Sequence, residues 1–89
     1  MTQQFTKDPN ATLDYQINWS LWLGTDTIVT STWVVPTGIT RGSDSNGTTT
    51  TTIWLSGGTA GDDYKLVNRI VTAGGRTEDR TITIRMREK

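Results

Sequence analysis

The chain contains no cysteine and no histidine among its 89 residues. Without cysteine it offers no disulfide and no thiol nucleophile, and without histidine it lacks the commonest general base and a leading ligand for transition metals. Carboxylates remain, but the adjacent Asp62 and Asp63 would point to opposite faces of a strand. We therefore expect no enzymatic activity, no cofactor and no metal site.

Long apolar runs and an excess of one charge are also missing. No apolar stretch approaches the ~20 residues that a membrane-spanning helix requires, and the N-terminus lacks the charged start and apolar stretch of an export signal. The 9 basic residues balance 9 acidic ones, whereas nucleic-acid-binding proteins carry a marked basic excess. The sequence therefore predicts a soluble protein with neither a membrane nor a nucleic acid as its partner.

Short segments that alternate apolar and polar residues follow one another along the chain, and such segments are typical of half-buried β-strands. Strands are predicted at residues 13–19, 27–35, 48–55, 63–72 and 78–87, with at most a short strand at 39–41. No segment has helical periodicity. The pattern predicts an all-β fold, an immunoglobulin-like antiparallel β-sandwich of about seven strands. Residues 11–89 would form this single domain, and residues 1–10 a flexible N-terminal arm or a short first strand.

Several aromatic residues are predicted to be structural. Tyr15, Trp19 and Trp33 fall on inward positions of their strands, the last of them once a bulge near Thr30 or Ser31 corrects the alternation. Each aromatic buries a large area, which matters in so small a core.

A turn motif and two polar features also have structural interpretations. Gly61 and Tyr64 have the Gly-x-x-Tyr spacing of a tyrosine corner, in which the tyrosine hydroxyl bonds back to the backbone of the turn. Asn68 is predicted inward, where it would satisfy buried backbone groups. Residues 42–47 are expected to form a loop, since their fragment of calcium-loop spacing lacks the terminal glutamate.

Four residues are candidates for an interaction surface. Trp54 alternates outward beside a threonine-lined face, where it would anchor a protein interface or stack on a sugar, unless a loop or the N-terminal arm covers it. Phe5 lies in the N-terminal segment. Arg85 and Arg87 point outward on the last strand, either to protect a sheet edge from aggregation or to contact an acidic partner.

Seven segments spread over nearly the whole chain resemble a family of small structural proteins of tailed bacteriophages, encoded among head and tail morphogenesis genes of phages and prophages. They are FTKDP (5–9), LDY (13–15), WSLWL (19–23), STWVVP (31–36), WLSGGTAG (54–61), NRI (68–70) and GGRT (74–77). The resemblance implies an immunoglobulin-like sandwich with a role in the virion. None of the segments is a chemical motif, so no binding residue is carried over.

On this resemblance we expect a non-catalytic module that docks onto the head, neck or tail during or after virion assembly, for example as a decoration protein. Its partners would be other phage structural proteins and copies of itself, in the host cytoplasm during assembly and then in the virion. Many copies on a repeating lattice would turn weak contacts into stable attachment. The alternative is a carbohydrate-binding or host-surface adhesion module, for which Trp54 would share one surface with Tyr15 or Trp22.

Overall fold

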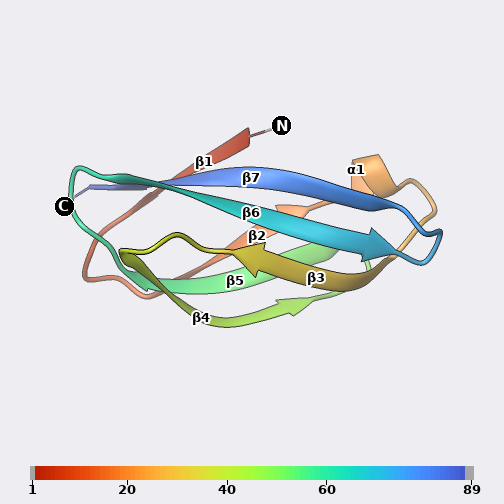
Figure 1. Cartoon of the computed structure of the whole chain (residues 1–89), viewed down its shortest axis with the longest axis horizontal. Coiled ribbons are helices and arrows are strands. Elements are labelled where there is room, and N and C mark those ends of the chain that lie inside the picture. Colours follow the sequence, from red (N-terminus) through yellow and green to blue (C-terminus); the bar gives the residue numbers. More distant parts are fainter. Residues whose placement is uncertain (1, 88–89) are drawn as a thin grey trace.

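The structure is a computed structural model that describes residues 2–87, and it consists of two β-sheets packed face to face (Figure 1). One sheet has four strands in the order β1-β7-β6-β3, and the other has three in the order β2-β5-β4. The all-β sandwich of seven strands that the sequence predicts is confirmed. Its elements are β1 (Thr2–Lys7), β2 (Leu13–Asn18), the short helix α1 (Ser20–Leu23), β3 (Ile28–Val34), β4 (Ile39–Asn46), β5 (Thr50–Gly57), β6 (Asp63–Thr72) and β7 (Thr77–Met86).

The strand order follows the immunoglobulin arrangement everywhere except at β1. The sets β2-β5-β4 and β3-β6-β7 correspond to strands B-E-D and C-F-G of a constant-type immunoglobulin domain. β1 lies beside β7 and runs parallel to it, in the sheet opposite to the one that holds β2. The sandwich is therefore antiparallel, as predicted, apart from this one pair.

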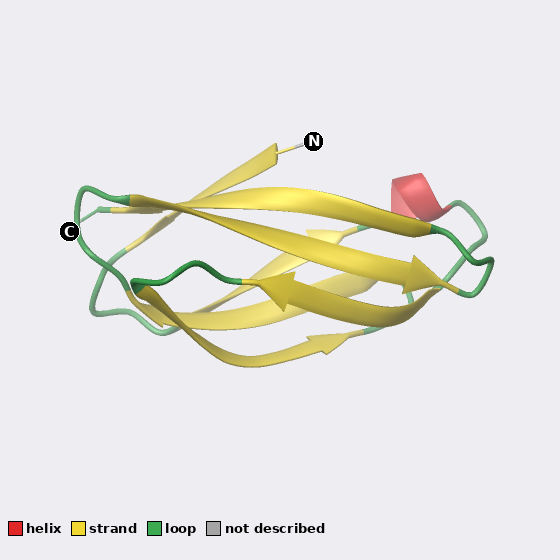
Figure 2. Cartoon of the chain, in the orientation of Figure 1, coloured by secondary structure: helices red, strands yellow, loops and turns green. Residues whose placement is uncertain are grey.

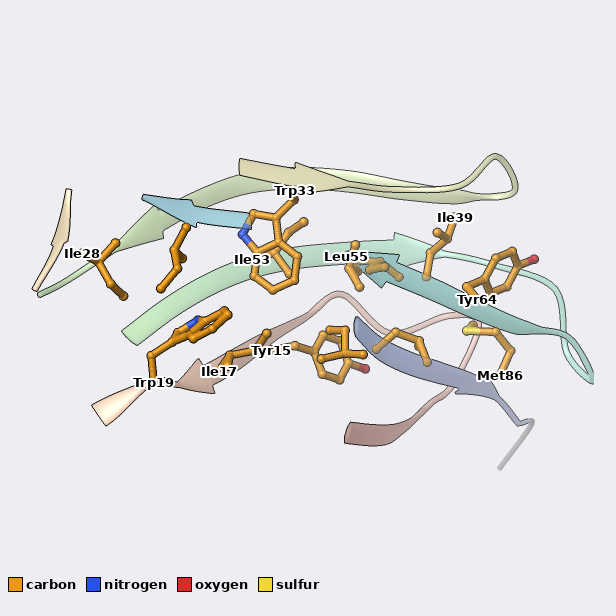
Figure 3. Packing of buried hydrophobic residues seen from close by; sticks show 14 of the residues in the cluster. Tyr15, Ile17, Trp19, Ile28, Trp33, Ile39, Ile53, Leu55, Tyr64 and Met86 are labelled. Atoms are coloured by element: carbon orange, nitrogen blue, oxygen red, sulfur yellow. The ribbon is translucent and has the colours of Figure 1, made fainter. Parts of the chain in front are cut away.

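The alternation of β6 and β7 explains how the core forms. Their register pairs inward residues with each other, for example Leu66 with Ile82 and Tyr64 with Ile84. Figure 3 shows the side chains of both sheets meeting between the ribbons. Burial of each large apolar side chain contributes roughly 1.5–3 kcal/mol. The buried apolar residues are Tyr15, Ile17, Trp19, Leu23, Ile28, Trp33, Ile39, Ile53, Leu55, Tyr64, Leu66, Ile70, Ile82, Ile84 and Met86.

A polar side chain, Asn68 of β6, lies fully buried within this apolar core. Its Oδ1 accepts hydrogen bonds from Thr51 Oγ1 at 2.7 Å and from Trp19 Nε1 at 3.1 Å. Its Nδ2 donates to Ser31 Oγ at 2.9 Å and to the Thr32 carbonyl oxygen at 3.0 Å. Both ends of the amide are thus satisfied, and the bonds to Thr51 of β5 and to Trp19, which follows β2, reach across the sandwich.

The corner between β5 and β6 is fixed by Tyr64. Its hydroxyl accepts a hydrogen bond from the Thr59 N–H at 3.1 Å, which is the bond that the Gly-x-x-Tyr spacing predicts. Gly61 has a φ of 90°, a conformation that favours glycine, and its N–H donates to the Met86 carbonyl oxygen at 2.8 Å. The corner is therefore bonded both to its own tyrosine and to the end of β7.

The N-terminal segment, for which the sequence left an arm and a strand open, forms β1 over residues 2–7. The half-buried Phe5 packs edge-on against Tyr15, with ring centroids 5.0 Å apart. The Lys7 side chain is fully buried, and its Nζ donates to the carbonyl oxygens of Gly57 at 2.8 Å and Asp8 at 3.0 Å. Burial lowers the pKa of Lys7 from its ordinary value of 10.5, against an opposing effect of the Asp8 charge. Lys7 thus ties the end of β1 to the end of β5.

Three local features differ from the sequence-based prediction, and Figure 2 shows the helix α1 and the strand β4 among them. The loop expected at residues 42–47 is wrong for most of its length, because β4 extends to Asn46 as a strand whose residues are all exposed after Ile39. The helix α1 was not predicted, since four residues are too few to display a helical period. The bulge in β3 falls between Ile28 and Thr30, slightly earlier than expected.

Candidate interaction surfaces

The outer surface of the β2-β5-β4 sheet carries short polar side chains around a single tryptophan. Trp54 belongs to the middle strand and is 43% exposed, so it points outward as the alternation predicts. Among residues 2–87, no loop covers it completely. We call this surface the hydroxyl face, and it comprises Asp14, Gln16 and Asn18 of β2, Thr40 and Ser45 of β4, and Thr50, Thr52, Trp54 and Ser56 of β5.

A β-bulge in β4 faces the tryptophan. The register of β4 with β5 shifts between Arg41 and Asp44. Gly42 and Ser43 together therefore oppose Trp54. A Cβ on Gly42 would lie only 3.2 Å from the Cβ of Trp54, so the glycine leaves the tryptophan the space it occupies. On the other side Trp54 is paired with Asp14, which is also a short residue.

The other aromatic residues proposed for a sugar-binding platform lie elsewhere. Tyr15 is buried in the core beneath the sheet, and Trp22 is half-buried within α1. Burial raises the pKa of the Tyr15 hydroxyl, and the charge of Asp14 adds to this shift. Within residues 2–87, Trp54 is the one aromatic residue on the hydroxyl face, whereas stacking platforms for glycans combine several rings.

Arg85 and Arg87 share one acidic partner. Arg85 Nε lies 3.7 Å from Asp63 Oδ2, and Arg87 Nη1 lies 3.5 Å from Asp63 Oδ1. Arg87 Nη1 also donates to the Met86 carbonyl oxygen at 2.8 Å. The interpretation of β7 as a sheet edge is wrong, because β7 lies between β1 and β6. The two arginines therefore do not protect a sheet edge.

A surface that the sequence did not predict lies at the end of the sandwich where α1 is found. The side chain of Leu21 is 99% exposed, although its helical neighbour Leu23 is buried and Trp22 is half-buried. Trp22 packs edge-on against the buried Trp19, with ring centroids 5.6 Å apart. A single turn of helix, which is unstable alone, is thus fixed by its inward residues while Leu21 faces solvent.

Two arginines hold α1, one near each end. The Arg76 guanidinium carbon lies 4.2 Å from the centre of the Trp22 ring, and its Nη2 donates to the Leu23 carbonyl oxygen at 3.0 Å. The Arg80 guanidinium carbon lies 4.3 Å from the centre of the Trp19 ring, and its Nη1 donates to the Asn18 carbonyl oxygen at 3.1 Å. Both are cation–π contacts, which stabilise by about 0.5–2 kcal/mol each. We call Trp19, Trp22, Arg76 and Arg80 the Trp–Arg cluster.

Asp26 completes the anchoring of this end. Its carboxylate pairs with Arg76 Nε at 3.1 Å and accepts the backbone N–H groups of Thr27 at 2.8 Å and Gly74 at 3.0 Å. The hydrogen bond from the Thr72 hydroxyl is the largest influence, and with these others it lowers the pKa of Asp26 from 3.8 to about 2. The carboxylate therefore joins the turn after α1 to the hairpin between β6 and β7.

The described residues offer no sign of a chemical site. Between residues 2 and 87 there is no pocket and no group of three acidic, histidine or cysteine side chains that would hold a metal ion. In the same residues, no helix is long and apolar enough to span a membrane.

The outer surface of the four-stranded sheet carries exposed valines and the Arg69–Asp79 ion pair, in which Arg69 Nε lies 2.8 Å from Asp79 Oδ1. The exposed valines are Val29, Val34 and Val71.

Comparison with known families identifies the family of the chain. The family described as podophage GP4 fiber-tail adaptor protein gp77 matches residues 7–85, which include every strand from β2 to β6 and nearly all of β7. Among curated proteins, no match was found. The resemblance to small structural proteins of tailed phages is confirmed, and the chain belongs to the family of podophage GP4 fiber-tail adaptor protein gp77.

Proposed function

We propose that this chain is a non-catalytic adaptor of a podophage tail, which docks by protein–protein contacts and helps to attach a fibre to the tail. The family description supports a structural role in the tail. The observation that carries a docking function is Trp54, which is 43% exposed on the middle strand of the hydroxyl face. Exposed tryptophans ringed by polar groups are typical anchors of protein interfaces.

The shape of this face favours a macromolecule over a small ligand. Small molecules bind in concave sites that enclose most of their surface, whereas Trp54 stands on the outside of a sheet. The hydroxyl groups around it would donate and accept hydrogen bonds at the rim of an interface with the partner. Within the chain, Thr52 Oγ1 already accepts a hydrogen bond from Gln16 Nε2 at 3.3 Å.

The tail is the location we propose within the virion, in preference to the head or neck that the sequence left open. The chain would reach the tail during assembly in the host cytoplasm. Tails present several equivalent positions, so several adaptor copies would contribute weak contacts that add up to firm attachment. The immunoglobulin-like strand order supplies a rigid scaffold for these contacts.

The experiment compares wild-type protein with Trp54→Ala. Particles from a phage lacking this gene are incubated with purified protein, separated into heads and tails, and analysed by quantitative mass spectrometry. We expect wild type in the tail fraction, and binding weakened by at least tenfold for the variant, since loss of a hot-spot tryptophan costs about 2 kcal/mol or more. Val34→Ala is the matched control, because Val34 is 67% exposed on the outer face of the opposite sheet.

Two results would contradict this proposal separately. Absence of wild-type protein from the tail fraction would exclude the adaptor function. Binding of Trp54→Ala at the wild-type level, with an unchanged melting temperature, would leave the adaptor function standing and exclude the hydroxyl face as its docking surface.

A further inference from the structure

We propose that the α1 end of the sandwich is a second docking surface, which binds a tail protein that offers an apolar socket with a carboxylate at its rim. This inference rests on the proposed adaptor function, because an adaptor must hold two partners. We call this surface the helix-end surface, and it consists of Leu21, Trp22, Arg76 and Arg80.

The first argument is the exposure of a fixed leucine. Leu21 is 99% exposed, yet it stands on a turn whose next two residues pack inward. The backbone bonds from Leu23 N to Trp19 O at 2.9 Å and from Gly24 N to Ser20 O at 3.2 Å close that turn. An isolated exposed leucine is ordinary. The backbone of Leu21 is already fixed before binding, so little further backbone entropy is lost when its side chain contacts a partner.

The second argument is that the fixing comes from residues far away in the sequence. Arg76, at the hairpin before β7, covers Trp22 and bonds the Leu23 carbonyl oxygen. Arg80, on β7, covers Trp19 and bonds the Asn18 carbonyl oxygen. The two ends of α1 are thus attached to one strand and its turn. Tryptophan and arginine are also the residues most enriched at the energetic centres of interfaces.

The third argument is charge. Arg76 is paired with Asp26, but Arg80 has no ion pair with any residue between 2 and 87. Glu78, the acidic residue on the same face of β7, accepts the N–H of Asp79 at 3.1 Å through its Oε1. A partner that covered Leu21 would also remove Arg80 from water, which is costly without a counter-charge. The remaining guanidinium donors of Arg80 therefore favour a partner with a carboxylate beside its apolar socket.

The two anchors lie apart, although the hydroxyl face extends to Asn18, whose carbonyl oxygen accepts a hydrogen bond from Arg80 of the helix-end surface. Trp54 pairs with Asp14, four residues before Asn18 at the end of β2. At ~3.3 Å per residue, this places Asn18, the residue before the N-cap of α1, about 13 Å from Trp54 along the sheet. Trp54 also points away from the core on the outside of the sheet, while α1 lies at the end of the sandwich (Figure 1). One molecule can therefore hold a partner at each place.

The test uses the full chain with Leu21→Ser and Arg80→Glu, in the same assay on particles that lack the gene. Each change should weaken binding to tails by about tenfold or more, as expected for a central interface residue. Val29→Ser is the matched control for Leu21→Ser, since Val29 is 58% exposed on the outer face of the four-stranded sheet. Arg69→Glu is the control for charge. Leu21→Ser should melt like wild type, because its side chain contacts almost nothing.

Each outcome decides between specific alternatives. If wild type and Leu21→Ser bind equally, the helix-end proposal is wrong and the adaptor function stands. If wild type itself does not bind, both are wrong. If Arg80→Glu folds and binds like wild type while Leu21→Ser does not, the carboxylate part is wrong. If light scattering shows wild-type oligomers that Leu21→Ser abolishes, the occupant is a second copy of the chain and the proposal of a different tail protein is overturned.

Discussion

At the scale of single residues, Asn68 has the largest expected effect on stability. Its side chain is fully buried and serves as the common partner of Thr51, Trp19 and Ser31. Asn68→Ala should lower the free energy of unfolding by about 3 kcal/mol, because it leaves several buried polar groups without partners. Urea unfolding followed by tryptophan fluorescence measures this. Asn46→Ala is the control, because Asn46 is exposed at the end of β4 and should cost less than about 0.5 kcal/mol.

Asp26 gives a pH dependence whose direction is fixed by its shifted pKa. In the unfolded chain the carboxyl binds its proton near the ordinary pKa of 3.8, but in the folded protein only near about 2. Between these values the unfolded state holds more protons, so stability falls as the pH falls from 4 toward about 2. Asp26→Asn should be less stable than wild type at pH 7 and should lose less stability over that acid range. If the free energies of unfolding of wild type and Asp26→Asn fall in parallel over this pH range, the lowered pKa of Asp26 in the folded protein is contradicted.

What the sequence could predict about single residues depends on the regularity of the strand around them. Trp54 and Asn68 occupy defined positions of alternating strands, so the outward and inward orientations follow from parity alone. Leu21 lies in WSLWL, which continues the preceding apolar pattern and gives no sign of a helical turn. The stacking of Arg80 on Trp19 joins residues distant in the chain and has no local pattern at all.

At the scale of elements, α1 is the one whose stability depends most on side chains from elsewhere. Arg76→Gln removes the contact with Trp22, the ion pair with Asp26 and the bond to the Leu23 carbonyl oxygen. Amide hydrogen exchange at Leu23 and Gly24 should become about tenfold faster, while the core amides of β5 and β6 keep their rates. Arg69→Gln, which breaks the exposed pair with Asp79, should leave all of these rates unchanged. Equal acceleration in both variants would mean that Arg76 does not hold the helix.

Elements with one buried face were predictable, and those without one were not. β6 alternates strictly, and β7 places Ile82, Ile84 and Met86 inward although Thr83 is buried as well, so the limits of both strands were predicted to within a residue or two. β4 exposes all residues after Ile39, so hydrogen bonding to β5 makes it a strand, with no apolar pattern to mark it. The parallel pairing of β1 with β7 arises from tertiary packing of Phe5 and Lys7, which no alternation within β1 specifies.

At the scale of the whole molecule, the sandwich is elongated, with extents of 41 × 22 × 19 Å. This shape separates the hydroxyl face from the helix-end surface while a single core supports both. The Asn68 hydrogen bonds and the Lys7 contacts join the two sheets, so neither surface can move far relative to the other. A small sandwich without disulfides can thereby act as a rigid spacer between two larger proteins.

This geometry predicts that the two surfaces contribute independently to tail binding. Because Trp54 stands on the middle strand β5 and Leu21 on α1, beyond the end of β2, the free energies of binding lost by Trp54→Ala and Leu21→Ser should add. Each single variant should bind tails about tenfold more weakly, and the double variant should be weakened by about the product of the two factors. Quantitative mass spectrometry of the tail fraction measures all three, and a double variant that binds as well as the weaker single variant would show that one partner covers both surfaces.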